Sequence, residues 1–255
     1  MKEIIANGHI IKLYDSIDEM PIVNFQKYNK FILIDSGLGS DIDSVDSHLV
    51  NLVKLIKTDK VKASRELQNL RQTMHMIVSG ISPKYLAFAA LIHSIDGEAI
   101  TDLSDDNLKN VLNKLNYIKH NTIAQFLAWL KKKLDTELET YFPNEFGNDA
   151  REKEVYDKLK QKTLFKLDEI INDNDNSEQI NKIEDFLFSL YKPKNFEGKD
   201  SVEIKYDKQF ETTCMYISQE TNMNAKKMTV LEFYNTLGEL KKQAELKAKA
   251  YKKHK

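Results

Sequence analysis

Residues 82–92 read Ser82-Pro83-Lys84-Tyr85-Leu86-Ala87-Phe88-Ala89-Ala90-Leu91-Ile92, and the expected fold is built around this stretch. Pro83 suits the first turn of a helix, where a backbone N–H has no partner in any case. From Tyr85 to Ile92 the stretch is apolar on every side, which is typical of a helix that is buried all round. The sequence therefore predicts a helix here, at the centre of the first domain.

Amphipathic helices are predicted on both sides of this stretch. Apolar residues recur every three or four positions, the spacing that places them on one face of a helix. Asp41 is a plausible N-terminal cap, and Gly37 and Gly80 suit helix ends. The expected helices span about 21–36, 41–56, 59–79, 105–115 and 122–141.

The N-terminus predicts a β-hairpin over residues 3–14. Two apolar segments flank Asn7-Gly8, a pair that tolerates the positive φ of a tight primed turn. Because an isolated hairpin is marginally stable in water, its apolar residues must pack on the helices or pair with a strand of another chain. Ile4 and Ile10 are therefore candidate interface residues.

A boundary between two domains is expected near Pro143, Gly147 and Asn148. Beyond it the pattern predicts a helical hairpin, a short strand over 202–206, a helix over 210–220 and a final helix that begins after Thr229. The expected domains are 1–142 and 149–255. The fold class is mainly α: a multi-helix bundle with a short N-terminal β-hairpin and a long C-terminal helix.

The composition excludes several classes of protein. The 255 residues can bury a sizeable core, and the single Cys214 leaves no intrachain disulfide or multi-thiolate zinc site. Because the longest apolar segments fall well short of 18 residues, membrane insertion is not expected. Secretion is not expected either, because Met1-Lys2-Glu3 leads into a short apolar patch without the layout of a signal peptide. Lys plus Arg total 38 against 39 Asp plus Glu, so the net charge by itself indicates no partner.

The sequence contains no coherent catalytic motif. Residues 35–39, Asp35-Ser36-Gly37-Leu38-Gly39, suggest a dinucleotide-binding turn or a glutamate racemase segment. The first would need a small residue at position 42 and flanking strands, and the second would need two catalytic cysteines. A helix end and turn are favoured instead. The six histidines lack metal-ligand spacing, and His75 and His93 are expected to be hydrogen-bonded groups near the core. The chain is thus expected to be neither an enzyme nor a cofactor-binding protein.

Residues 173–184 partly match a calcium-binding loop. Oxygen-bearing side chains occupy the ligand positions and helices are expected on both sides. Glu178 stands where such a loop needs glycine, so the alternative is a turn whose polar residues cap the next helix. The candidate ligands are Asp173, Asp175, Ser177, Asn181 and Glu184.

Charge is segregated along the chain. Residues 168–178 hold five carboxylates and no lysine or arginine, and residues 239–255 hold seven lysines against two glutamates. The basic tail is either a solvated helix end or a contact for nucleic acid or for the acidic segment of a neighbouring copy. The candidate interface lysines are Lys241, Lys242, Lys247, Lys252 and Lys253.

Residues 20–106 and the C-terminal helix resemble a family of virion structural proteins from crAss-like tailed phages. The segments that carry the resemblance are Met20-Pro21-Ile22, Phe25-Gln26-Lys27-Tyr28-Asn29-Lys30, Ile34-Asp35-Ser36-Gly37-Leu38-Gly39-Ser40-Asp41, Asn69-Leu70-Arg71-Gln72, Ser94-Ile95-Asp96-Gly97 and Met228-Thr229-Val230-Leu231-Glu232-Phe233-Tyr234.

The resemblance implies a homo-oligomeric ring in the head-to-tail connector or tail, below the portal and around the path of the packaged DNA. It implies a place in the virion after assembly in the host cytoplasm, with the portal or neighbouring tail proteins as partners. It brings no catalytic residues. The alternatives are a tail-assembly chaperone that is absent from the mature particle, and an enzyme or calcium-binding helical module.

Overall fold

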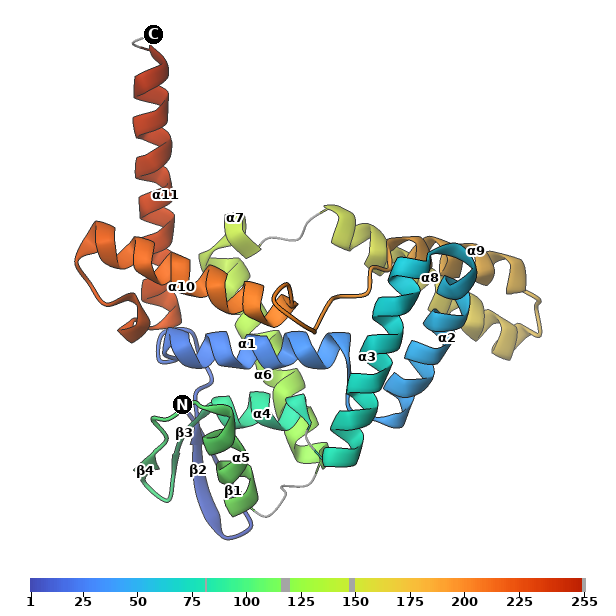
Figure 1. Ribbon diagram of the computed structural model, residues 1–255, viewed down its shortest axis with the longest axis horizontal. Coiled ribbons are helices and arrows are strands. Elements are labelled where there is room, and N and C mark those ends of the chain that lie inside the picture. The colour runs from blue at the N-terminus through green and yellow to red at the C-terminus, as the bar shows by residue number, and fades with distance from the viewer. Residues whose placement is uncertain (81, 116–119, 147–149, 254–255) are drawn as a thin grey trace. The chain divides into compact units, whose positions relative to one another are not determined.

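A computed structural model of the chain describes residues 1–80, 82–115, 120–146 and 150–253 (Figure 1). The side chains of residues 120–122, 144, 150–153 and 250–253 are outside this description. The chain divides into two compact units, of which the first comprises Met1–Tyr141 and Lys194–Lys255 and the second comprises Phe142–Pro193. The mainly α fold, the N-terminal hairpin and the long C-terminal helix are confirmed.

The predicted hairpin is part of a four-stranded antiparallel sheet in the first unit. The strands lie in chain order and are β1 (Lys2–Ala6), β2 (His9–Leu13), β3 (Ile92–Ile95) and β4 (Glu98–Ala99). Asn7-Gly8 forms the turn between β1 and β2, and Asp96-Gly97 forms the turn between β3 and β4. All four of these residues have the positive φ that primed turns need. Strand β2 of the N-terminal hairpin thus pairs with β3 of the same chain.

Helix α4 (Pro83–Ala90) forms the core of the first unit, as its apolar sequence predicts. Phe88 is 1% exposed and meets Phe126 edge to face, with ring centroids 5.7 Å apart. The helix ends earlier than expected, because Ile92–Ile95 pairs with β2 as strand β3. A buried apolar segment of this length suits a helix and a central strand equally well.

Helices pack around α4 in the first unit. They are α1 (Ile22–Gly37), α5 (Asp105–Lys114) and α6 (His120–Tyr141), all of which contact α4 or the segment that follows it. The side-chain amide of Asn24 donates to the Ala90 carbonyl at 2.8 Å and so ties α1 to the end of α4. Among the described residues, no helix is long and apolar enough to cross a membrane.

Helices α2 (Ile42–Thr58) and α3 (Lys60–Ser79) form an antiparallel helical hairpin with one residue between them (Figure 1). Asp41 caps α2 by accepting a bond from the Ser44 N–H, as predicted. Asp59 caps α3 in the same way, and Gly80 ends it with a φ of 67°.

The second unit contains the predicted helical hairpin. Its elements are α7 (Pro143–Phe146), α8 (Ala150–Asn172) and α9 (Ser177–Leu190). Ile180 and Ile183 of α9 are buried in it. The turn between the two long helices consists of residues 173–176.

The chain after residue 193 belongs to the first unit, which differs from the expected division into 1–142 and 149–255. The physical reason is backbone pairing: the Ile22 N–H donates to the Met228 carbonyl, and the Val230 N–H to the Met20 carbonyl, both at 2.9 Å. The elements of this segment are helix α10 (Val202–Thr221), the 3-10 turn η1 (Ala225–Lys227) and helix α11 (Val230–Lys253).

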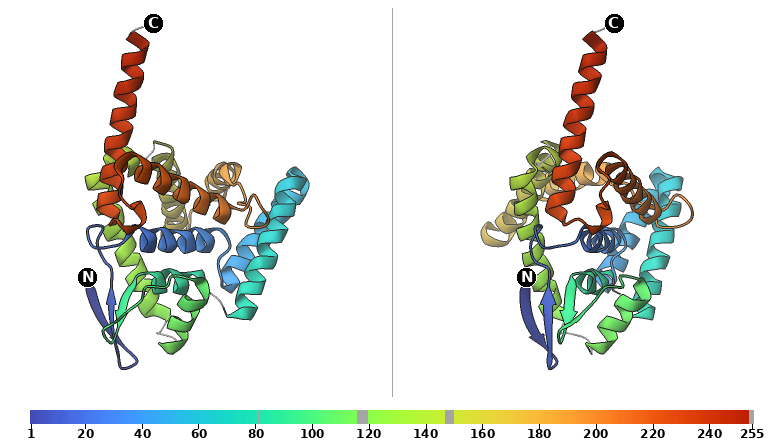
Figure 2. Two further views of the ribbon diagram at one scale, coloured as in Figure 1. Left: turned by 60° about the vertical axis from the view of Figure 1, so that its left-hand side comes forward. Right: turned by 90° about the vertical axis from the view of Figure 1, so that its left-hand side faces the viewer.

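The expected strand over 202–206 is wrong, because these residues form the first turns of α10. The Ser201 hydroxyl accepts a bond from the Ile204 N–H and caps this helix. The predicted cap at Thr229 is confirmed, and it forms a reciprocal capping box with Glu232. Helix α11 then extends away from the other elements of the first unit (Figure 2).

Candidate interaction surfaces

The α2–α3 hairpin exposes a row of large apolar side chains along both helices, which we call the α2–α3 face. Its members are Ile42, Leu49, Val53 and Ile56 of α2, and Leu67, Met74 and Val78 of α3. Val53 is 65% exposed and Val78 is 88% exposed. The sequence predicts amphipathic helices here, and an apolar face normally packs inward. In the structure, the residues of the α2–α3 face instead point outward.

The two rows lie on the same side of the hairpin for a geometric reason. In both rows, exposed residues directly follow buried ones: Leu49 follows His48 on α2, and Leu67 follows Glu66 on α3. One residue turns a helix by roughly 100°, so both exposed rows are rotated equally from the buried rows. The buried rows of the two helices face each other, as the contact of His48 with Glu66 shows. Because the helices are antiparallel, the same rotation along each chain turns both exposed rows to the same side of the hairpin.

A buried polar cluster holds this hairpin to the end of α1. The His48 ring donates from Nδ1 to Glu66 Oε1 at 2.9 Å and from Nε2 to the Leu38 carbonyl at 3.0 Å. The Thr73 hydroxyl also donates to the Leu38 carbonyl, at 2.7 Å. Glu66 is 0% exposed. With Glu66 ionised, both partners of the ring are acceptors, so the ring that fits them is an imidazolium with an N–H on each nitrogen.

The pKa of His48 is raised above its ordinary value. Burial of the ring lowers this pKa, but the hydrogen bonds to Glu66 and Leu38 outweigh burial. A group whose pKa is raised on folding contributes stability that is fully present below its unfolded pKa, about 6.5 for histidine. This contribution is lost as the pH rises through the raised pKa of the folded protein.

We therefore expect the destabilisation caused by His48→Gln to be larger at about pH 6 than at about pH 9, on either side of the ordinary histidine pKa. Urea unfolding of the wild type and the variant at both pH values measures the difference. His75→Gln is the matched control, because His75 is exposed. An equal effect of His48→Gln at the two pH values would contradict the ion pair.

His48 is the buried histidine that the sequence analysis missed. His75 is exposed, and His93 is half-buried against the edge of Tyr14, with no hydrogen-bond partner for its Nδ1 among the described residues. The expectation that these two are the hydrogen-bonded histidines near the core is wrong. Burial raises the pKa of the Cys214 thiol to about 11, so this cysteine is protonated at neutral pH.

The glycines of residues 35–39 have a structural explanation. A Cβ on Gly37 would lie 2.4 Å from the Phe196 ring, and Gly39 has a φ of 70°. These residues end α1 and allow close packing, as the favoured interpretation predicts.

The end of the α2–α3 hairpin is strongly basic. Residues 54–65, which we call the basic tip, contain Lys54, Lys57, Lys60, Lys62 and Arg65 against Asp59 alone, a formal charge of +4. The first turns of α2 carry the opposite sign, with Asp43 and Asp46 exposed. The hairpin is thus polarised along its length.

The second unit also exposes an apolar row, which we call the α8 face. Its members are Tyr156, Leu159, Leu164, Leu167, Ile170 and Ile171. Ile170 is 79% exposed. The opposite side of α8 packs on α9.

The acidic segment, residues 168–178, lies at the end of the α8 face. Asp168 accepts bonds from the side-chain amides of Asn172, Asn176 and Asn174, and these hold its pKa below the usual range. Glu169 accepts the Asn176 N–H at 3.1 Å. Hydrogen bonding to the ionised form therefore favours a charged Asp168 in this segment.

The structure does not assemble the five calcium candidates into a site. Asp173 and Asp175 lie in the short turn, whereas Ser177, Asn181 and Glu184 lie on α9. Glu184 forms an ion pair with Lys162 at 2.8 Å. Across the described parts of the chain, no group of three or more His, Cys, Asp or Glu could hold a metal ion.

The candidate interface residues of the N- and C-termini lie in different environments. Ile10 is exposed and pairs across the hairpin with the exposed Ile5, whereas Ile4 is half-buried opposite the buried Ile11. Lys241, Lys242 and Lys247 lie exposed along α11, and Lys242 bonds Glu239 at 2.7 Å. The side chains of Lys252 and Lys253 are outside the described residues.

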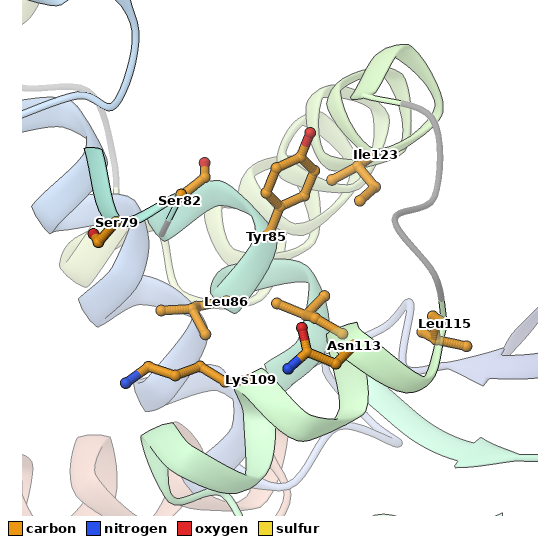
Figure 3. Close-up of a pocket in the computed structure, with 10 residues that line it drawn as sticks. Ser79, Ser82, Tyr85, Leu86, Lys109, Asn113, Leu115 and Ile123 are labelled. Carbon is orange, nitrogen blue, oxygen red and sulfur yellow. The ribbon is translucent and has the colours of Figure 1, made fainter. Parts of the chain in front are cut away.

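A pocket of about 290 Å³ opens beside α4 in the first unit (Figure 3). Tyr85, Leu86 and Ile123 supply apolar surface, and Lys109 and Asn113 of α5 supply polar groups. Lys109 forms an ion pair with Asp106 at 3.4 Å. The sequence does not reveal this pocket, because its lining residues come from separate segments between Ser79 and Ile123.

Comparisons with protein families, with curated proteins and with solved structures give no significant match.

Proposed function

We propose that this chain is a structural subunit that assembles with copies of itself into a ring. The observation that carries the proposal is the presence of two separate exposed apolar faces, one on each unit: the α2–α3 face and the α8 face. Soluble monomers rarely expose contiguous apolar patches of more than a few hundred Å², and larger ones mark interaction sites.

The energetic reason is the hydrophobic effect. Covering an exposed Val, Leu or Ile side chain gains roughly 1.5–3 kcal/mol when burial is complete. The two faces together expose Ile42, Val53, Val78, Ile170 and Ile171, among others, so a large gain is available to a complex that covers them. This supports assembly in preference to an isolated chain.

The number of faces favours a ring. A two-fold dimer uses the same patch on both subunits, whereas a ring uses two different patches, one toward each neighbour. This chain has two different apolar faces, so it has what a head-to-tail contact requires. Such a contact closes into a ring when the rotation between neighbours closes.

The finer proposal is a ring in the head-to-tail connector or tail of a tailed phage, with the portal or neighbouring tail proteins as partners. It is supported by the resemblance of residues 20–106 and of the C-terminal helix. The exposed lysines of α11 give the ring a basic surface for packaged DNA or for an acidic protein neighbour.

We expect the purified full-length protein to form one discrete species whose mass is a multiple of 29.6 kDa. Native mass spectrometry over a range of concentrations measures it, and co-purification with the portal tests the finer proposal. Val53→Glu should shift the protein to 29.6 kDa, because a charge then lies in the α2–α3 face.

Met223→Glu is the matched control, since Met223 is exposed outside both faces. It should leave the assembled mass unchanged. A wild-type protein that is monomeric at all concentrations, alone and with the portal, would overturn the ring.

A further inference from the structure

We infer that the α2–α3 face of one copy binds the α8 face of the next copy, with the basic tip of the first against the acidic segment of the second. This inference rests on the proposed function and names the two surfaces that meet. Four observations support it: the apolar character of both faces, their lengths, their charges and the direction in which the charges run.

The two faces fit as helix surfaces. The α2–α3 face is a double row over two antiparallel helices, and the α8 face is a single row on one helix. Laying one apolar helix over a helical pair produces the packing of a helical bundle. From Ile42 to Ile56 the first face is about 21 Å long, and from Tyr156 to Ile171 the second is about 23 Å long, at 1.5 Å per residue. Each face can therefore cover the full length of the other.

The charges beside the two faces are complementary. The basic tip has a formal charge of +4 over residues 54–65, and the acidic segment has −5 over residues 168–178. Opposite potentials guide association and set the register of an interface. Two basic tips, or two acidic segments, would repel each other, so the charges oppose any pairing of like faces in which tip meets tip or segment meets segment.

The charge pattern also sets the direction of the contact. Helix α2 begins with exposed Asp43 and Asp46 and ends in the basic tip. Along α8, residues 154–162 carry three lysines against two acidic residues, and the acidic segment follows. Opposite charges meet along the whole length only if α8 of one copy runs parallel to α2 of the other. The expected contact is thus directional as well as heterologous.

The basic tip is therefore a better partner for the acidic segment than the lysines of the C-terminal helix α11. The basic tip lies at the end of an exposed apolar face, as does the acidic segment. Among the described residues, the α11 lysines lie beside a single large exposed apolar side chain, Leu246. Charge and apolar surface together favour the tip as the partner.

Charge reversal on each side provides the test. The tip variant is Lys57→Glu, Lys60→Glu and Lys62→Glu, which changes residues 54–65 from +4 to −2. The last two changes place glutamates in the first turn of α3, where they favour the helix. The segment variant is Asp173→Asn, Asp175→Lys, Glu178→Lys and Gln179→Lys, which changes residues 168–179 from −5 to +1. Asparagine tolerates the positive φ of position 173.

We expect each full-length variant alone to need a concentration at least about tenfold higher than the wild type for assembly, because its own tip and segment now repel. An equimolar mixture should regain assembly, since the acidic tip of one variant meets the basic segment of the other and the remaining contacts are wild type. Native mass spectrometry measures the assembled fraction, and circular dichroism of each variant checks folding.

The matched control is Lys199→Glu, Lys208→Glu and Lys227→Glu, which makes the same charge change at exposed lysines outside both faces. It should assemble like the wild type. If the wild type assembles but the variants do so equally well, or if the mixture stays unassembled, the inference is overturned and the proposed function stands. If the wild type itself is monomeric, the proposed function is overturned and the inference with it.

Discussion

Glu66→Ala is expected to lower the free energy of unfolding of the first unit by about 3–5 kcal/mol, the range for breaking a buried ion pair from one side. The variant leaves the buried His48 ring without the carboxylate that favours its charged form, and it removes this polar link between α2 and α3. Urea unfolding followed by Trp129 fluorescence measures the change, because Trp129 is the single tryptophan and lies in the first unit.

Two comparisons separate the ion pair from a general effect of substitution. Glu139→Ala removes an exposed glutamate and should change stability by no more than about 0.5 kcal/mol. The double variant His48→Leu with Glu66→Met removes both charges and should lose less stability than Glu66→Ala alone. If the double variant loses as much as or more than Glu66→Ala, the cluster does not act as an ion pair.

Phe88→Ala is expected to lower the free energy of unfolding by about 3–5 kcal/mol, the usual cost of deleting a buried aromatic side chain. Phe88 is almost fully buried in α4 and contacts the Phe126 ring, so the truncation opens a cavity at the centre of the first unit. Urea unfolding with the same fluorescence signal measures the loss.

Phe88→Leu keeps most of the apolar volume and should lose clearly less stability than Phe88→Ala. Tyr216→Ala truncates an aromatic residue that is 39% exposed, and it should also lose much less. A loss for Phe88→Ala no greater than that for Tyr216→Ala would show that α4 is not the core of this unit.

The candidate surfaces could be predicted from the sequence only in part. The amphipathic pattern of residues 42–56 predicts the helix, and the acidic residues of 168–178 are visible in the chain. Periodicity cannot tell which side of an apolar arc is covered, since that depends on the neighbour that packs on it. The outward position of Val53 and Leu67 therefore emerged only from the structure.

The buried polar cluster could not be predicted because its members are scattered. His48 and Glu66 are 18 positions apart, and the third partner is a backbone carbonyl at Leu38. Polar residues on a helix normally indicate its solvent side, and the sequence shows no pairing that would reverse this interpretation.

Local signals determined most of the secondary structure. The turn at Asn7-Gly8, the cap at Asp41 and the glycine at position 80 act through neighbouring backbone atoms, so the sequence alone sufficed for them. Long-range pairing decided the rest. Strand β3 exists because β2 lies beside it, and residues 194–255 rejoin the first unit because Met228 and Val230 bond the backbone near Pro21. Such contacts join residues far apart in the chain, and only the tertiary structure brings them together.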